Sequence, residues 1–209
     1  DLQPQRTVAL EMGAKGLVPA LGLRWDAALF EARARDELVP FDIPGGNGRR
    51  YFRNAGRTVR RGGELGLQAD AGPIAVQAAY TYSHFRYADY TVGTTSYAGR
   101  RIPGVPEHAL ATTLALRRGT ATFSATADVA GPMDVDDANS AQAPGRTILG
   151  LAVSNLMELG RLRIVPLVAL QNLGGARSVG SVSVNAAGGK FFEPAPGRTL
   201  LVRLALGRT

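Results

Sequence analysis

Arginine is the residue type whose placement in this sequence points most clearly to chemistry. The chain of 209 residues has a formal net charge of +7, and nearly all of its basic side chains are arginines. The densest run, RRYFRNAGRTVRR at residues 49–61, places arginines beside aromatic residues. Guanidinium groups favour anionic ligands, and neighbouring tyrosines add stacking and hydrogen bonds. The candidate ligand-binding residues are Arg49, Arg50, Tyr51, Arg53, Arg86, Tyr87, Tyr90, Arg100 and Arg101.

Each arginine also has a less specific interpretation. Most charged side chains serve solubility or pair with nearby acids, and such surface pairs contribute little energy. Basic residues beside aromatics are also typical of nucleic-acid binding, but no recognised nucleic-acid motif accompanies the run. We therefore expect no nucleic-acid partner.

Catalytic and metal-binding patterns have little support. The sequence has no Gly-x-Ser-x-Gly, no His-Glu-x-x-His and no phosphate-binding loop. Ser83, His84 and Asp89 come nearest to a nucleophile cluster, but closeness in sequence does not provide triad geometry. The run DVDDANSA (134–141) offers oxygen ligands, yet it lacks the central glycine and closing glutamate of a helix-loop-helix calcium site. Local hydrogen bonds from its side chains to the backbone are the better interpretation. We expect no catalytic residue, metal site or cofactor.

The elements that must position the arginines are strands. The chain has 26 glycines, 12 prolines and no cysteine, which is typical of a turn-rich β protein without disulfides. Apolar and polar residues alternate with the period of a β-strand in nine segments. These segments are 7–15, 27–35, 58–71, 74–83, 109–117, 121–129, 147–154, 161–172 and 198–207. The prediction is an all-β fold, an antiparallel meander of about nine long strands.

The lengths of the connections favour a membrane environment over a soluble sandwich, which would show the same alternation. Short connections near 16–21, 71–74, 117–121 and 155–160 alternate with long ones at 36–50, 84–108, 130–146 and 173–198. In a meander this places every long loop at one end. Outer-membrane barrels have this asymmetry and cross the bilayer with tilted strands of about ten residues. We therefore expect an open, partial transmembrane β-barrel.

The alternation also predicts which side chains face lipid. The expected outer face contains Phe30, Leu65, Leu67, Val76, Ala78, Tyr80, Leu114 and Phe123. The expected inner, water-facing surface contains Arg33, Arg35, Arg57, Arg60, Glu64, Gln68, Gln77 and Thr126. A water-filled lumen would allow the inner arginines to stay charged.

Several stretches resemble one family, in the order in which that family has them. VALEMGAKG resembles a Glu-x-Gly-x-Lys strand start, and YFRNAGRTVRRGGELGL is similar to an Asn-Ala-Gly…Arg-Gly-x-Glu-Leu strand. YTYSHFRYADY and RRIPGVPEH resemble a tyrosine-rich strand and the Pro-Gly-x-Pro segment that re-enters the wall. GPMDVDDANSAQAPG and the segment ending in GGKFFEPAPGRT resemble the last two large external loops. The family is that of the TonB-dependent outer-membrane receptors of the siderophore-receptor type.

The resemblance implies a location and a function. Residues 1–209 would form the C-terminal portion of the barrel in the bacterial outer membrane, and the plug and remaining strands would be absent from this chain. The intact receptor would take up a ferric siderophore or similar metal chelate, driven by the TonB complex through that plug. Outer-membrane lipid and lipopolysaccharide would surround the wall, and lipopolysaccharide phosphates are an alternative partner for the arginines. Phe191 and Phe192 would lie on the last external loop, either at the outer interface or packed within the loop.

A self-contained small barrel, acting as a passive pore or an adhesion module, is the alternative. Strand number discriminates between the two, because simple antiparallel closure and bacterial single-chain barrels require an even number. With nine strands, 7–15 and 198–207 should stay unpaired with each other, which leaves an open sheet with two free edges.

Overall fold

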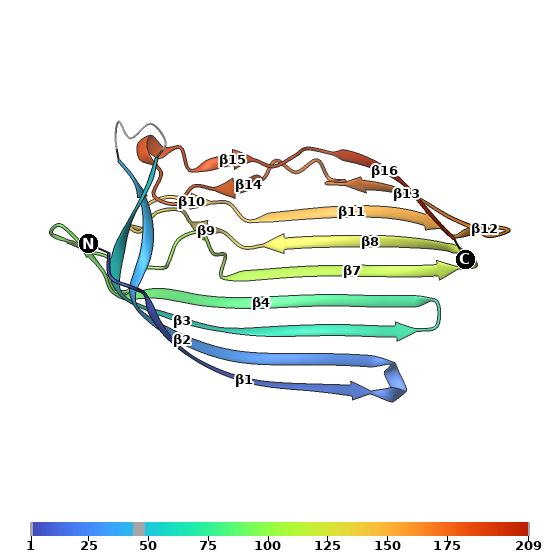
Figure 1. The fold of residues 1–209 in the computed structure, drawn as a ribbon, viewed down its shortest axis with the longest axis horizontal. Coiled ribbons are helices and arrows are strands. Elements are labelled where there is room, and N and C mark those ends of the chain that lie inside the picture. The colour runs from blue at the N-terminus through green and yellow to red at the C-terminus, as the bar shows by residue number, and fades with distance from the viewer. Residues whose placement is uncertain (1, 44–48, 209) are drawn as a thin grey trace.

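The computed structural model describes residues 2–43 and 49–208, and it is dominated by one sheet of ten strands (Figure 1). All its strands except β12 have ten residues or more, which confirms the predicted meander of nine long strands. Each pairs with its neighbour in an antiparallel ladder. The long strands are β1 (Arg6–Val18), β2 (Leu23–Asp42), β3 (Arg50–Ala71), β4 (Ile74–Asp89), β7 (His108–Arg118), β8 (Ala121–Ala130), β11 (Arg146–Asn155), β13 (Leu162–Gln171) and β16 (Thr199–Arg208).

The remaining elements are short and lie in the connections. Single 3-10 turns occur at Pro19–Leu21 and Ala187–Gly189, and β12 (Met157–Leu159) pairs with the start of β13. Three small hairpins are formed by β5 (Thr91–Val92) with β6 (Thr95–Ser96), β9 (Met133–Asp134) with β10 (Gln142–Ala143), and β14 (Val179–Val182) with β15 (Phe192–Pro194). None of the described residues belongs to a helix that is long and apolar enough to cross a membrane.

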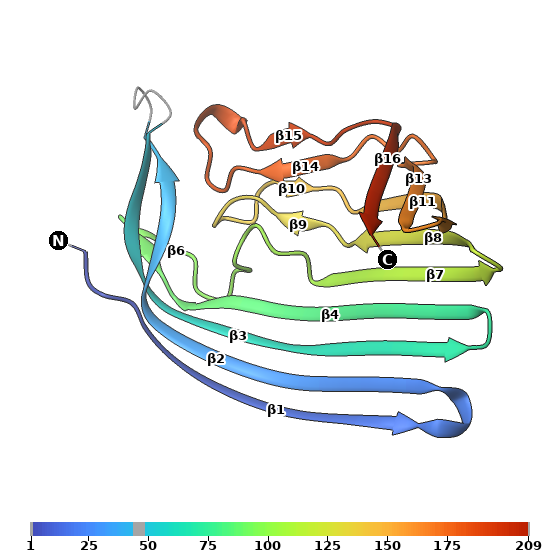
Figure 2. The same cartoon turned by 45° about the vertical axis from the view of Figure 1, so that its right-hand side comes forward.

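Short and long connections lie at opposite ends of the sheet, as the sequence predicts (Figure 1). We call these the turn end and the loop end. Gly72 and Gly119 sit in two tight turns with φ of 58° and 60°, a left-handed conformation that residues with a side chain rarely adopt. At the loop end, hairpins β9–β10 and β14–β15 lie side by side (Figure 2).

The two faces of the sheet follow from the register, because residues directly opposite on antiparallel strands share a face. Leu65 lies opposite Ala27 and Tyr80, whereas Gln68 lies opposite Arg24 and Gln77. The two side chains are therefore on opposite faces, as expected. The outer positions confirmed by the register are Leu65, Leu67, Val76, Ala78, Tyr80, Leu114 and Phe123. The confirmed inner positions are Arg60, Glu64, Gln68, Gln77 and Thr126.

Part of strand β2 was assigned to the wrong faces. Phe30 lies opposite Gly62 and points inward, where its ring meets Phe85 edge-on at 6.2 Å. Arg33 lies opposite Val59 and points outward, and Arg35 and Arg57 share that outer face. The prediction fails here because apolar residues occur on both faces of this segment: Leu29 points outward with Ala27, and Phe30 points inward with Ala28.

The sequence predicts a long loop at 36–50, but much of this connection is strand. Strands β2 and β3 continue past the rest of the sheet and form a bent two-stranded arm (Figures 1 and 2). Asp36 has φ of 56°, a conformation that aspartate tolerates better than most residues, and the bend occurs there. Beyond Asp36 the odd-numbered residues of β2 turn inward, so Glu37 and Val39 become buried. The tip, residues 44–48, lies outside the described residues.

The sheet is open within the part of the chain that the structure describes. Strand β1 pairs with β2 and strand β16 pairs with β13, and no ladder joins β1 to β16 among the described residues. This confirms the expected open sheet with two free edges. Nine strands arranged in this way do not enclose a pore by themselves.

Candidate functional site

A small core lies at the loop end, beyond the inner face of the sheet. Val39 and Ala55 on the arm pack with Tyr87 and Tyr90, and all four side chains are at most 5% exposed. The tyrosine rings lie 4.7 Å apart, and Tyr97 adds a third ring 5.4 Å from Tyr90. Aromatic contacts of this kind add to the energy of burying the rings. The arm and the β4–β7 connection are therefore held together.

One carboxylate joins these segments to two further loops. Asp137, in the β9–β10 connection, accepts a 2.6 Å hydrogen bond from the hydroxyl of Tyr87 and a 3.0 Å bond from Nδ2 of Asn185. Asn185, which follows β14, also donates to the carbonyl of Pro40 on the arm at 3.1 Å. Four connections thus meet at one point, and we call this assembly the loop cluster.

The acidic run 134–141 makes hydrogen bonds between side chains and backbone, which is the interpretation that the sequence analysis favours over a calcium site. Asp136 accepts hydrogen bonds from the backbone and hydroxyl of Ser140, at 2.8 and 2.5 Å. Asn139 exchanges two bonds with the backbone of Arg101, at 2.8 and 2.9 Å. These contacts orient the loop against the β4–β7 connection.

A cavity of about 230 Å³ opens beside the loop cluster. Its lining residues come from all four connections and are Phe41, Arg53, Val92, Tyr97, Asp136, Asp137, Ala138 and Asn185. The guanidinium carbon of Arg53 lies 3.8 Å from the centre of the Phe41 ring, a cation–π contact that holds the charge in place. Within the described residues, Nε of Arg53 and the hydroxyl of Tyr90 are buried without a hydrogen-bond partner. Buried polar atoms usually have a partner, so this corner of the loop cluster favours a polar ligand or water.

The pKa values of three groups at the loop end are shifted: those of Tyr87, Tyr90 and Glu107. Burial, together with the negative charge of Asp137, raises the pKa of Tyr87, and burial is also the main reason that the pKa of Tyr90 is raised. Burial opposes ionisation of Glu107, but its hydrogen bond to His84 and the charge of Arg101 lower its pKa overall. The tyrosines stay neutral, and Glu107 stays charged, at physiological pH.

A second cavity, of about 510 Å³, lies between the inner face and hairpin β14–β15. Thr126, Gln171 and the ion pair of Arg146 with Asp128, at 3.1 Å, line its wall side. The wall side of this cavity is therefore polar, and the hairpin covers it at the loop end.

The structure brings only some of the predicted ligand-binding residues together. Tyr87 and Tyr90 are buried in the loop cluster, each with a side chain 1% exposed. Arg86 donates to Nε2 of His84 and to the carbonyl of Gly99, on the outer face, at 2.8 and 2.7 Å. Arg101 pairs with Glu107 at 2.9 Å.

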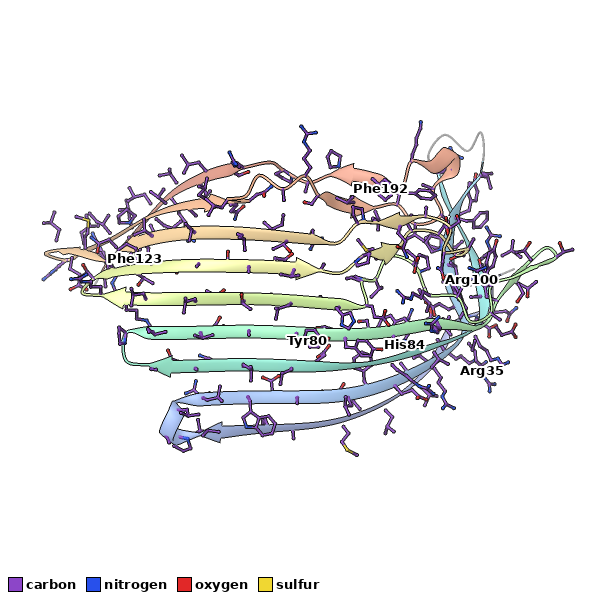
Figure 3. The ribbon with its side chains drawn as sticks, turned by 180° about the vertical axis from the view of Figure 1, so that it is seen from behind. Arg35, Tyr80, His84, Arg100, Phe123 and Phe192 are labelled. Atoms are coloured by element: carbon purple, nitrogen blue, oxygen red, sulfur yellow. The ribbon has the colours of Figure 1, made fainter. Side chains whose placement is uncertain are left out.

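Four other predicted residues are at the loop end. Three of them remain candidates for direct contact with a ligand, and the side chain of the fourth is outside the described part of the structure. Arg49 and Arg100 are exposed at the loop end, and Figure 3 labels Arg100 there. Tyr51 packs against Phe41 at 6.0 Å, next to Arg53. Arg50 begins β3, and its side chain lies outside the described part of the chain.

Sequence reasoning missed the residues that hold the loops together. Asp137 was considered as a calcium ligand or, preferably, as part of a loop with local hydrogen bonds, but not as a link between loops, and Phe41 and Asn185 were not considered. Asn185 has φ of 56°, and an asparagine in a loop is a signal for such a position. Its partners are up to 145 residues away in the sequence, so its role could not be predicted locally.

Two further expectations concern isolated residues. Ser83 points to the inner face and His84 to the outer face, since they are neighbours on β4, so no nucleophile cluster forms with Asp89. Asp89 lies 3.9 Å from Arg57. Phe191 and Phe192 lie on the last external connection and contact each other edge-on at 6.0 Å, with Phe192 at 46% exposure (Figure 3).

Comparison with known proteins relates this architecture to one group. Residues 1–164 match the family model described as TonB dependent receptor-like, beta-barrel. The fold is similar to that of the ferric citrate transporter FecA, with 17% identity and a TM-score of 0.80, covering 99% of this chain and 32% of that one. It is also similar to the ferric yersiniabactin uptake receptor FyuA from Yersinia pestis (17% identity, 98% and 30% covered, TM-score 0.76). The siderophore receptor PiuA from Acinetobacter baumannii matches at 19% identity (97% and 28% covered, TM-score 0.73). The chain thus spans less than a third of the length of these structures. The family match over most of its residues shows that this chain belongs to the TonB-dependent receptor-like β-barrel family.

Proposed function

We propose that this chain is the C-terminal part of the barrel wall of an outer-membrane receptor that takes up a ferric siderophore or a similar metal chelate. Barrels of this family lie in the bacterial outer membrane. The similar structures are those of a ferric citrate transporter, a ferric yersiniabactin uptake receptor and a siderophore receptor. A chelate of this class is the best candidate here.

The position of Arg53 carries the proposal. Its charge is fixed over Phe41 at the edge of a cavity that four ordered connections line, and Tyr51, Arg49 and Arg100 lie at the same end of the sheet. A preorganised cation loses little conformational freedom when it binds an anion, which strengthens binding. Aromatic rings beside it offer stacking for a planar chelating group.

We further propose that uptake is driven by the TonB complex through a plug domain in a part of the protein outside residues 1–209. The inner face presents polar residues such as Glu64, Gln68 and Gln77 along its length, which suits contact with a hydrated plug. The outer face presents apolar residues, which suits contact with membrane lipid. The alternative, a self-contained pore, would need the two free edges to pair with each other.

The test is the affinity of the full-length receptor for a panel of ferric chelates, measured by quenching of intrinsic fluorescence. The panel contains an anionic citrate chelate, an anionic catecholate chelate and an uncharged hydroxamate chelate. Arg53→Gln should weaken binding of an anionic chelate by about ten-fold, the effect of losing one charge-assisted hydrogen bond. Arg100→Gln should act in the same direction.

The matched control is Arg117→Gln with Arg118→Gln, which removes charge at the turn end of the sheet. The control should leave chelate affinity unchanged. Equal losses in the control and in Arg53→Gln, or no binding of any chelate, would overturn the proposal.

A further inference from the structure

The cavity beside the loop cluster holds charges of both signs that are not paired with each other. Arg53 lines it from the arm, whereas Asp136 and Asp137 line it from the β9–β10 connection. Among the described residues, none of these three side chains takes part in an ion pair. The cavity therefore has a basic side and an acidic side.

The acidic side is held in place by uncharged donors. The carboxylate of Asp137 accepts hydrogen bonds from the hydroxyl of Tyr87 and the amide of Asn185. The carboxylate of Asp136 accepts them from the backbone and the hydroxyl of Ser140. Asp137 is only 7% exposed, and a buried charge usually has a partner of the opposite sign. These two carboxylates are therefore ordered, and they lack a cation.

The basic side is also fixed. The guanidinium group of Arg53 lies over the Phe41 ring, 3.8 Å from its centre, and its Nε is buried without a hydrogen-bond partner among the described residues. Tyr97 and Val92 add an aromatic and an apolar side chain to the lining of the cavity. Arg53 therefore offers a preorganised site for a carboxylate, next to a surface that packs against carbon atoms.

The hydroxyl of Tyr90 is a further polar group without a partner in the described part of the chain. Burial and the charge of Asp137 raise the pKa of Tyr90, whereas the charge of Arg53 lowers it, so this hydroxyl lies near charges of both signs. A phenol hydroxyl both donates and accepts hydrogen bonds, so it suits a carboxylate as well as an ammonium group. Tyr90 is 1% exposed, and buried polar groups rarely lack a partner.

The volume of the cavity limits what it can hold. It measures about 230 Å³, whereas pockets that enclose a whole drug-sized ligand measure roughly 300–1,000 Å³. A complete ferric chelate is therefore too large for it. One arm of such a chelate, of the size of a single amino acid, is a better match.

We propose that this cavity binds an arm of the chelate that carries both an ammonium and a carboxylate group, the free end of an α-amino acid. The carboxylate binds Arg53, the ammonium group binds Asp136 and Asp137, and the carbon atoms of the arm pack against Tyr97. A purely anionic arm is repelled by the two carboxylates, and a purely cationic arm is repelled by the arginine. An uncharged arm leaves all three charges without a counterion.

The inference rests on the proposed uptake of a chelate and specifies which chelates are preferred. The experiment measures the affinity of the full-length receptor, by quenching of intrinsic fluorescence, for three chelates with the same uncharged ferric trihydroxamate core. The first has an arm that ends in a free α-ammonium and a free α-carboxylate group, the second has this amine acetylated, and the third has this carboxyl group amidated. The first should bind about ten-fold more tightly than either of the others, the effect of one charge-assisted hydrogen bond. Equal affinities for the three would overturn the inference.

Two variants assign the charges to their partners. Asp136→Asn keeps the shape of the side chain and an oxygen for the backbone bond from Ser140, but it removes the negative charge. It should weaken binding of the two chelates with a free ammonium group by about ten-fold and leave the acetylated one unchanged. Arg53→Gln should weaken the two with a free carboxylate and leave the amidated one unchanged. Equal losses for all three chelates in either variant would mean that the charges of the arm are not recognised, which overturns the inference.

The matched control is Asp26→Asn, which removes an exposed carboxylate from the inner face, opposite Gly66 and far from the loop end. It should bind the three chelates as the parent receptor does, and a loss equal to that of Asp136→Asn would contradict the assignment of the site. If the anionic chelates of the first panel bind through Arg53 and the three matched chelates bind equally, the transport proposal stands and this inference is wrong. If no chelate of either set binds, both are wrong.

Discussion

Asp137 and Asn185 hold each other through two reciprocal hydrogen bonds. The backbone nitrogen of Asp137 donates to Oδ1 of Asn185 at 2.9 Å, and Nδ2 of Asn185 donates to Oδ2 of Asp137 at 3.0 Å. The pair joins the β9–β10 connection to the β14–β15 connection. Each connection contains its own small hairpin, and among the described residues no strand of one hairpin pairs with a strand of the other. Since Tyr87 and Pro40 bond to the same two residues, this pair is the centre of the loop cluster.

Asn185→Asp should open the loop cluster without unfolding the sheet. The substitution keeps the shape of the side chain but replaces a donor with a second carboxylate beside Asp137, so a hydrogen bond becomes a repulsion. The expected local destabilisation is about 1–3 kcal/mol, the usual effect of leaving a buried polar group without its partner. Hydrogen exchange of 87–102 and 134–141 should accelerate while β7 and β8 stay protected.

Asn185→Gly is the control for backbone strain in that experiment. Glycine adopts the φ of 56° without cost but makes no side-chain bond. If Asn185→Gly exchanges like the parent protein and Asn185→Asp does too, the pair does not hold the loops.

The buried tyrosines should make the loop cluster sensitive to high pH. Burial, with the charge of Asp137, raises the folded pKa of Tyr87 above its unfolded value of about 10. Because the pKa is higher in the folded state, the contribution of neutral Tyr87 to stability is fully present below about pH 10. That contribution is lost as the pH rises from the unfolded-state pKa towards the folded-state pKa. In a titration of near-ultraviolet tyrosinate absorbance, two of the six tyrosines should ionise late.

Tyr87→Phe identifies one of the late groups. It should remove part of the late absorbance change and leave the early part unchanged. An unaltered late phase in Tyr87→Phe would show that Tyr87 titrates normally.

The sequence predicted the strands and their order well because strand period and connection length are local properties. Leu65 and Gln68 were placed on the correct faces from alternation alone. Phe30 and Arg33 were not, although their period was also correct. Alternation gives two faces but does not say which one meets lipid, and around Phe30 both faces of β2 carry apolar residues.

The site was less predictable than the wall. Arg53 was identified because it stands in an arginine-rich, aromatic run, and it does line the cavity. Tyr87 was identified for the same reason, but it lies in the loop core, since the register of β4 with β3 places it against the buried Thr58. Contacts between external loops, such as that of Asn185 with Pro40, join residues far apart in the sequence and leave no periodic signal.

Glu37 and Arg60 should couple the arm to the wall. Glu37 is nearly buried, binds Arg60 and accepts a hydrogen bond from Thr58. Arg60→Met would leave this carboxylate with one partner, and we expect a loss of about 1–2 kcal/mol in local stability, less than for a fully buried pair because Arg60 is 30% exposed. Hydrogen exchange in 37–42 and 51–58 measures the loss.

Adding Glu37→Gln to Arg60→Met should recover part of that stability. The double variant removes the unpaired charge and keeps a side chain that can bond to Thr58. If the single and double variants exchange alike, the pair does not stabilise the arm.

Leu114 and Thr113 are neighbours on β7 that test the assignment of the faces. Leu114 lies opposite Val76 and Ala125 on the apolar outer face, whereas Thr113 lies opposite Gln77 and Thr126 on the polar inner face. A lysine on the lipid face near the middle of the bilayer costs about 2–4 kcal/mol, whereas a lysine facing water in the lumen costs far less. Leu114→Lys in the full-length receptor should therefore reduce the amount of folded barrel in outer-membrane fractions, scored by heat-modifiable migration in gels. Thr113→Lys adds the same charge one residue away and should leave that amount close to the parent level. Equal reductions in both variants would mean that the two faces of β7 do not differ in environment.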